Sequence, residues 1–124
     1  MEEIRTDNAP EAIGPYSQAV RSGNMVFLSG QIPIDPATGE VISGGIKEQT
    51  KRVFDNLTAV IKESGLLIDD VVKVTVYMTD LGEFALMNEV YALFFNEPYP
   101  ARATVGVKEL PKGVSVEVDA VLVG

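Results

Sequence analysis

The sequence contains no cysteine and no histidine among its 124 residues. Without cysteine, disulfides, thiolate zinc sites, iron–sulfur clusters and cysteine nucleophiles are all excluded, which fits a reducing compartment. Without histidine, the chain lacks the commonest general base and the serine–histidine pair of many hydrolases. Any chemistry performed by this chain must therefore use carboxylates, hydroxyls, lysine, arginine, backbone groups and water.

Long apolar runs are also missing. No segment approaches the roughly 20 uninterrupted apolar residues that a membrane-spanning helix needs, and the first residues, MEEIRTDNAPE, are acidic, unlike a signal peptide. A chain of this length is expected to form one domain, over residues 1–124, around one core. We expect a cytoplasmic protein without a membrane partner.

Basic residues are in the minority. Eighteen acidic against ten basic residues give a net charge of -8, and the longest basic run is Lys51-Arg52. Such a chain repels nucleic-acid phosphate on average, so a nucleic-acid partner is not expected. The excess of negative charge is better explained as a solubilising surface.

Residues 19–65 show a hairpin followed by a helix. The β-formers at 19–21 and 25–29 are separated by Ser22-Gly23-Asn24, which predicts a β-hairpin. The stretch DPATGEVISGGI predicts a loop with room for a short edge strand at 40–42. Apolar residues then recur with a helical period, which predicts an amphipathic helix that ends at Gly65. The periodic residues are Ile46, Thr50, Val53, Phe54, Leu57, Val60 and Ile61.

The second half of the chain alternates strand and helix. Residues 71–78 have period two, with Val72, Val74, Val76 and Met78 on one face. Asp80 and Glu83 resemble a capping box that opens a second amphipathic helix, which Pro98 ends. Period two returns at 101–107 and 114–123, and the turn between these segments predicts an antiparallel pair.

These elements predict an α+β fold with a single sheet and two helices on one face. Counting by twos assigns Ala103, Val105, Val114, Val116 and Val118 to the helix-covered face. Arg102 and Glu117 are then expected to project together from the uncovered face. That face also carries apolar side chains, which is typical of contact with another subunit.

Arg102 and Glu117 each allow two interpretations. Arg102, in EPYPARATVG, is either a strand arginine in a surface salt bridge or a residue that binds a carboxylate. The second interpretation is possible because a guanidinium offers two parallel hydrogen-bond donors. Glu117 is either the partner of a basic side chain or a group that orients water and passes a proton. The spacing alone leaves both choices open.

Seven motifs together resemble the RidA (YjgF, reactive intermediate deaminase A) family. The similarity covers nearly the whole chain, and the pairing of PAR with LPKG…VEVDA is its specific part. The motifs are GPYSQAV (14–20), VFLSGQIPIDPATGEV (26–41), NLTAVIKESG (56–65), VVKVTVYMTD (71–80), MNEVYALFF (87–95), YPARATV (99–105) and LPKGVSVEVDAV (110–121).

This resemblance implies a chorismate-mutase-like α+β fold with a single mixed sheet, assembled as a homotrimer that closes a central barrel with clefts between subunits. It implies a deaminase for metabolite damage control, which hydrolyses 2-iminobutanoate and 2-iminopropanoate to 2-keto acids and ammonia. No metal and no cofactor are expected, because a protonated iminium is already a strong electrophile.

The resemblance also implies roles for individual residues. Arg102 would clamp the substrate carboxylate and Glu117 would hold or activate water, while the pocket would be lined by Tyr16, Ser29, Asn88 and the backbone near Ala103. Many members have serine and cysteine after the PAR arginine, whereas this chain has Ala103 and Thr104, so a cysteine-dependent activity is excluded. The alternatives are a non-catalytic trimer that binds a small carboxylate and, less in keeping with the charge, an RNA-cleaving translation inhibitor.

Overall fold

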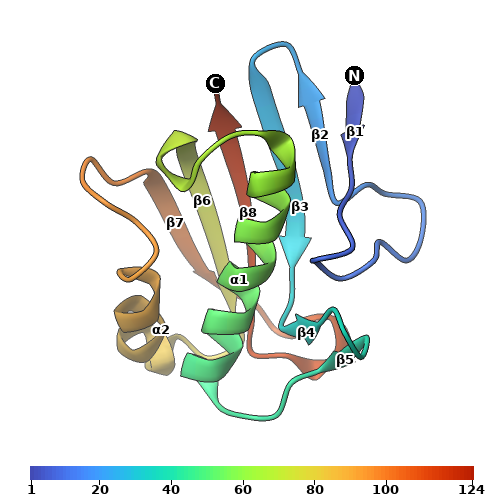
Figure 1. The fold of residues 1–124 in the computed structure, drawn as a ribbon. Coiled ribbons are helices and arrows are strands. Elements are labelled where there is room, and N and C mark those ends of the chain that lie inside the picture. Colours follow the sequence, from blue (N-terminus) through green and yellow to red (C-terminus); the bar gives the residue numbers. More distant parts are fainter.

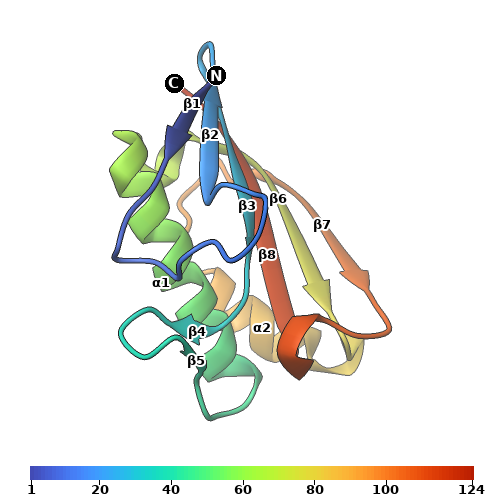
Figure 2. The ribbon, with the colours of Figure 1, turned by 90° about the vertical axis from the view of Figure 1, so that its right-hand side faces the viewer.

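The computed structural model describes residues 1–124 as a six-stranded mixed sheet with two helices on one side of it (Figures 1 and 2). The sheet order is β1-β2-β3-β8-β6-β7, and β6 and β7 form its one parallel pair. A small second sheet pairs β4 with β5. The elements are β1 (Glu2–Ile4), β2 (Ala19–Ser22), β3 (Met25–Gln31), β4 (Ile34–Asp35), β5 (Glu40–Val41), α1 (Ile46–Ser64), β6 (Val71–Met78), α2 (Phe84–Tyr91), β7 (Ala101–Gly106) and β8 (Val116–Val123).

The first half of the chain folds as its pattern predicts. The hairpin β2–β3 and the helix α1 are both present, and α1 ends at Gly65 in the left-handed conformation that favours glycine. The edge strand expected at 40–42 is β5. The strand β1, which was not expected, pairs with β2 at one edge of the sheet.

The expected pairing of the last two strands was wrong. Segments 101–107 and 114–123 do form β7 and β8, but β6 lies between them, parallel to β7 and antiparallel to β8. Because α2 connects β6 to β7, the chain makes a β–α–β crossover that returns parallel to its first strand. A longer connection with a 3-10 turn at Pro111–Gly113 then carries the chain to β8. As a result, β7 is an edge strand.

The second helix is shorter than the pattern predicts. The Asp80 side chain accepts a hydrogen bond from the backbone N–H of Gly82, so it caps the 3-10 turn at Leu81–Glu83 and forms no capping box with Glu83. The helix α2 follows and ends at Tyr91, and turns replace it before Pro98. Neither helix is long and apolar enough to cross a membrane.

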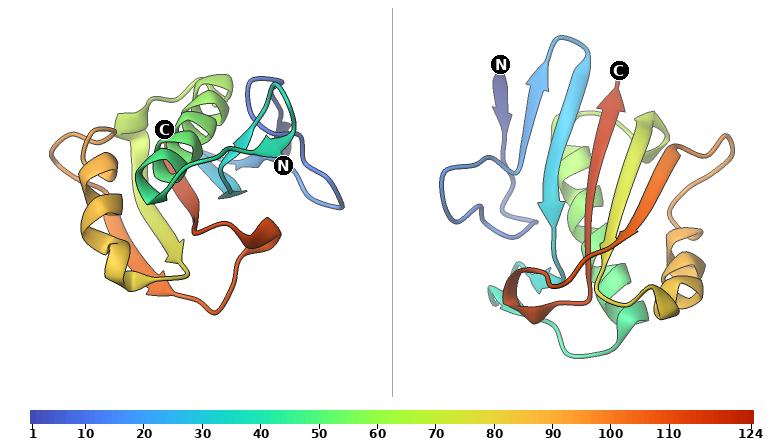
Figure 3. Two further views of the ribbon diagram at one scale, coloured as in Figure 1. Left: turned by 90° about the horizontal axis from the view of Figure 1, so that it is seen from below. Right: turned by 180° about the vertical axis from the view of Figure 1, so that it is seen from behind.

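The two faces of the sheet have different surroundings. One face packs under α1 and α2, and its buried side chains include Val74, Val76, Val116, Val118 and Leu122. The other face has no helix over it (Figure 3, right). A register irregularity between Val71 and Lys73 places Val71 in the core and leaves Val72 45% exposed, so the expected faces of these two residues were reversed.

Candidate functional site

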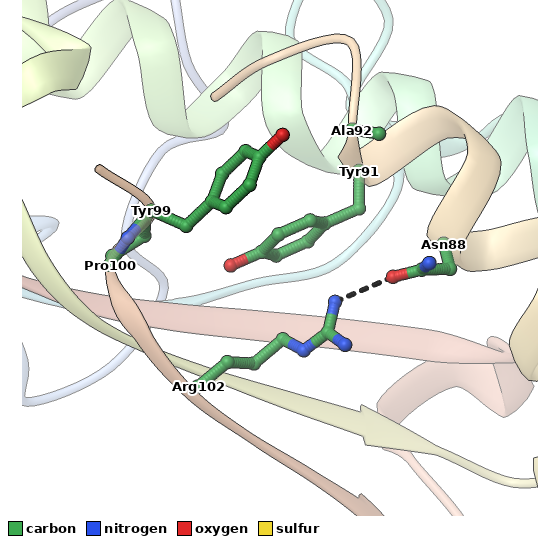
Figure 4. A pocket seen from close by; sticks show the side chains of 6 residues that line it. All are labelled: Asn88, Tyr91, Ala92, Tyr99, Pro100 and Arg102. Carbon is green, nitrogen blue, oxygen red and sulfur yellow. Dashed lines mark hydrogen bonds between the residues drawn. The ribbon is translucent and has the colours of Figure 1, made fainter. Parts of the chain in front are cut away.

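A cavity of about 440 Å³ lies between the start of β7 and the last turn of α2. The segment Tyr99–Pro100 leads into β7 on one side, and α2 contributes the opposite wall (Figure 4). The lining side chains are Asn88, Tyr91, Ala92, Tyr99, Pro100 and Arg102. Of the predicted site residues, Arg102 and Asn88 therefore meet in one cavity.

Arg102 is held by one hydrogen bond and two aromatic rings. Its Nη1 donates to Asn88 Oδ1 at 2.7 Å, and the guanidinium carbon lies 4.6 Å from the ring centre of Tyr91 and 5.3 Å from that of Phe84. Such cation–π contacts hold the guanidinium plane. No carboxylate lies within ion-pair distance of Arg102. The edge formed by Nε and Nη2 is therefore free to bind a carboxylate through two parallel hydrogen bonds.

Arg102 does not lie on the face where it was expected. It pairs with Val74 across β6–β7, and Thr104 pairs with Val76, so both share the helix-covered side of the sheet. The expectation that Ala103 and Val105 face the helices was also wrong. Small residues on an edge strand say little about which side is buried, and the long stem of Arg102 packs along aromatic rings while its charged end reaches the cavity.

Glu117 lies on the opposite, bare face. It pairs with Tyr77 across β6–β8, and its carboxylate lies directly against Gly30, where an added Cβ would be 2.0 Å from Glu117 Oε2. Any side chain at position 30 would therefore displace the Glu117 carboxylate from its present place. Arg102 and Glu117 of one chain are separated by the sheet, so the expectation that they project from the same face was wrong.

Burial and a neighbouring carboxylate both act on the ionisation of Glu117. Burial raises the pKa of the Glu117 carboxyl, and the negative charge of Asp119, two residues along the same strand, raises it further. Tyr77 donates a hydrogen bond from its hydroxyl to Asp119 Oδ2 at 3.0 Å. A carboxyl with a raised pKa in a partly buried position is a candidate for proton transfer.

The remaining predicted residues lie near the Glu117 side. Tyr16, which is 53% exposed, lines a second cavity of about 310 Å³ together with Gly30 and Lys112. Ser29 donates its hydroxyl proton to the backbone carbonyl of Ser17 at 2.6 Å, so it fixes the strand that carries Gly30. Ala103 pairs with Thr75 on the bare face.

Three contributors were missed by sequence reasoning. Tyr91 and Phe84 lie in the predicted second helix and Gly30 follows the predicted strand at 25–29, but none of the three was expected in the site. The helical spacing of Phe84, Asn88 and Tyr91 could have indicated one shared face, but nothing in the sequence places that face over Arg102.

No group of three or more acidic side chains is arranged to hold a metal ion.

The chain is similar to known proteins over nearly its whole length. Residues 6–123 match the family model described as Endoribonuclease L-PSP. A RutC family protein of Pyrococcus abyssi is 57% identical over 120 residues, which are 97% of this chain and 94% of that protein. A protein of Dermatophagoides farinae named 2-iminobutanoate/2-iminopropanoate deaminase is 46% identical over 120 residues, again 97% of this chain and 94% of that protein.

Solved structures show the same fold over the whole chain. RidA from Psychrobacter sp. PAMC 21119 has a TM-score of 0.96 and 48% identity, and the match covers 100% of both chains. The structure of E. coli TdcF with bound serine has a TM-score of 0.94 and 45% identity, and the match covers 100% of this chain and 99% of that one.

Proposed function

The chain belongs to the Endoribonuclease L-PSP family, which includes the RutC and RidA proteins, and on that premise we propose that it hydrolyses 2-imino acids to 2-keto acids and ammonia. The resemblance to the RidA family and the RidA-type α+β fold are confirmed. Support for the reaction comes from the relative named as a deaminase of 2-iminobutanoate and 2-iminopropanoate. We expect the protein to act in the cytoplasm, where it removes reactive imines.

The observation that carries this proposal is the state of Arg102. Its guanidinium lines a cavity, is fixed by Asn88 and Tyr91, and has no acidic partner within the chain. The alternative of a surface salt bridge therefore has no support in the geometry. The proposed ligand is a small carboxylate, and the bound serine in the structure of E. coli TdcF is a small molecule of that class.

In the proposed reaction, water adds to C2 of the protonated imine, R–C(=NH2+)–COO−, and the C=N π electrons move to nitrogen. The ionised Glu117 takes a proton from the attacking water and passes it to the amino nitrogen. The C–N bond then breaks, ammonia leaves with the bonding pair, and a lone pair of the hydroxyl oxygen forms the C=O bond. The hydroxyl proton is released to ammonia, so imine and water give a 2-keto acid and an ammonium ion.

The opposite positions of Arg102 and Glu117 support a site shared between chains. One chain alone does not bring them together, because its own sheet lies between them. We propose a homotrimer in which the bare faces line a central barrel and each cleft combines Arg102 of one subunit with Glu117 of the next. A monomeric mass in solution, measured by light scattering, would remove this part of the proposal.

The test is a trapping assay. An amino-acid oxidase generates the imine in place and semicarbazide captures whatever imine persists, so an active deaminase lowers the trapped product. Arg102→Ala is expected to lose this activity by at least about a hundredfold, since a charge-assisted clamp is removed. The matched control is Arg52→Ala, because Arg52 also donates to an asparagine, Asn56, but on α1 and away from the cavity.

The outcomes separate the candidate functions. Imine hydrolysis that is lost in Arg102→Ala and kept in Arg52→Ala supports the deaminase. Carboxylate binding without hydrolysis by the wild-type protein would favour the non-catalytic trimer. RNA cleavage, the reaction in the name of the family model, is disfavoured by the net charge of -8.

A further inference from the structure

The hydroxyl of Tyr91 is buried without a hydrogen-bond partner. Tyr91 is 6% exposed, and its phenolic oxygen makes no hydrogen bond of good geometry within the chain, although the Arg102 guanidinium lies close enough to act on the phenol. A buried hydroxyl left unpaired destabilises the folded chain, whereas phenylalanine would keep the packing without that cost. Nearby positions on the same aromatic surface, 84, 94 and 95, are all phenylalanine. The hydroxyl therefore needs an explanation other than packing.

The direction of this hydroxyl is fixed by the ring that carries it. The Tyr91 ring makes an edge contact with Phe54, at 5.5 Å between ring centres, and a tilted contact with Phe95 at 4.7 Å. The guanidinium of Arg102 lies 4.6 Å from the ring centre. In Figure 4 the hydroxyl points away from Asn88, toward the segment of Tyr99 and Pro100, which also lines the cavity.

We propose that Tyr91 is a further ligand-binding residue, whose hydroxyl donates a hydrogen bond to the carboxylate that Arg102 binds. The identity of that carboxylate as part of a 2-imino or 2-keto acid rests on the proposed function. Arg102 already uses Nη1 to bind Asn88, so a hydroxyl donor from Tyr91 would add to the donors that the guanidinium still offers to a carboxylate. Burial raises the pKa of the Tyr91 phenol and outweighs the nearby charge of Arg102, which lowers it, so the phenol stays protonated and able to donate at neutral pH.

We infer that a ligand reaches the hydroxyl past Tyr99. Tyr99 is 60% exposed and stands beside the Tyr91 ring (Figure 4), so its side chain can turn outward without disturbing the core. Ligand binding then replaces an enclosed, unpaired hydroxyl with one that is hydrogen-bonded. The expected result is affinity gained from a group that contributes no stability to the free protein.

The test compares wild type with Tyr91→Phe for binding of 2-oxobutanoate, the stable product of the proposed reaction, by NMR titration. Loss of one charge-assisted donor is expected to weaken binding by about ten- to a hundredfold. The melting temperature is expected to stay the same or rise, because an unpaired hydroxyl is removed. The Nε–H signal of free Arg102 should keep its chemical shift, showing that the ring still holds the guanidinium.

Binding of 2-oxobutanoate by Tyr91→Phe within about twofold of wild type overturns the inference. So does weaker binding that is accompanied by a moved Arg102 Nε–H signal, since the ring and not the hydroxyl would then be responsible. A wild-type protein that binds 2-oxobutanoate without hydrolysing imines removes the proposed function and leaves the role of Tyr91 standing. A wild-type protein that binds no 2-oxobutanoate removes both.

Discussion

The two faces of the sheet contribute different parts of the candidate site, and they differ in how they are stabilised. On the covered face, Arg102 lies among aromatic side chains beside a packed core. On the bare face, Glu117 lies against Gly30, beside Tyr77 and Asp119, with no helix above it. The covered face holds a cation by packing, whereas the bare face holds an acid by close approach of backbone.

This difference supports the proposed association of the chain with further copies of itself. The covered face is complete within one chain, because both helices come from that chain. The bare face exposes apolar side chains, including Phe27, which is 41% exposed, and Val105, which is 39% exposed. An exposed apolar surface of this kind is typical of a surface that another subunit covers.

The largest expected effect is on stability and concerns the covered face. Phe54 is 1% exposed and contacts Tyr91, Phe94 and Phe95. Phe54→Ala is expected to lower the free energy of unfolding by about 3–5 kcal/mol, because it leaves a cavity in the core. Urea denaturation measures this loss, and the control Leu93→Ala, at an 82% exposed position, should stay within about 0.5 kcal/mol of wild type.

On the bare face the same kind of truncation should behave differently. Phe27→Ala is expected to cost less than Phe54→Ala, with a loss that depends on protein concentration, because in the proposed trimer the exposed part of Phe27 is buried only by association. A loss equal to that of Phe54→Ala at every concentration would contradict the distinction between the faces.

The next largest effect concerns the close approach at Gly30. Gly30→Ala places a Cβ where Glu117 Oε2 now lies, so the carboxylate must move while the core is untouched. A displacement of this size is expected to lower kcat/KM for imine hydrolysis by about a hundredfold. Gly45→Ala is the matched control, since its Cβ would meet only Glu48 Oε2 at 3.6 Å. Full activity in Gly30→Ala would separate Glu117 from the chemistry.

A smaller but more specific effect is expected when two inactive variants are mixed. Arg102→Ala and Glu117→Gln chains, unfolded together and refolded, should recover about a quarter of the wild-type activity, because each mixed trimer contains one cleft with both native residues. The trapping assay measures the recovery, and each variant refolded alone is the control. No recovery, with mixed trimers verified by mass, would mean that no cleft combines residues of two chains.

The sequence was most informative where one periodicity persisted over several residues. The helix α1 and the strand β6 were predicted because a buried stripe or face repeats along each of them. The order of β6, β7 and β8 could not be predicted from adjacency, because a crossover through α2 inserts β6 between strands that are neighbours in the sequence.

The candidate site was also predicted only in part. The identities of Arg102, Asn88 and Glu117 as candidates came from motifs, but their faces depend on register. With alanine on both sides of Arg102, the local pattern gives no sign of which face is buried. The contact of Gly30 with Glu117 joins strands far apart in the sequence, so only the folded chain shows why glycine is needed there.

The smallest expected effect is a change in pH dependence on the bare face. If ionised Glu117 takes the proton from water, kcat/KM rises with pH through the pKa of Glu117, which burial and the charge of Asp119 raise above its usual range. Asp119→Asn removes the negative charge, so this rise should move to lower pH, while Asp55→Asn, on α1, should leave it in place. A shift to higher pH, or none, would mean that Asp119 does not set the protonation of Glu117. Burial still raises the pKa of Glu117 in the Asp119→Asn variant, so the increase of kcat/KM with pH should still occur above the pH range of an ordinary glutamate. The remaining shift then measures the effect of burial, and the difference between variant and wild type measures the effect of the Asp119 charge.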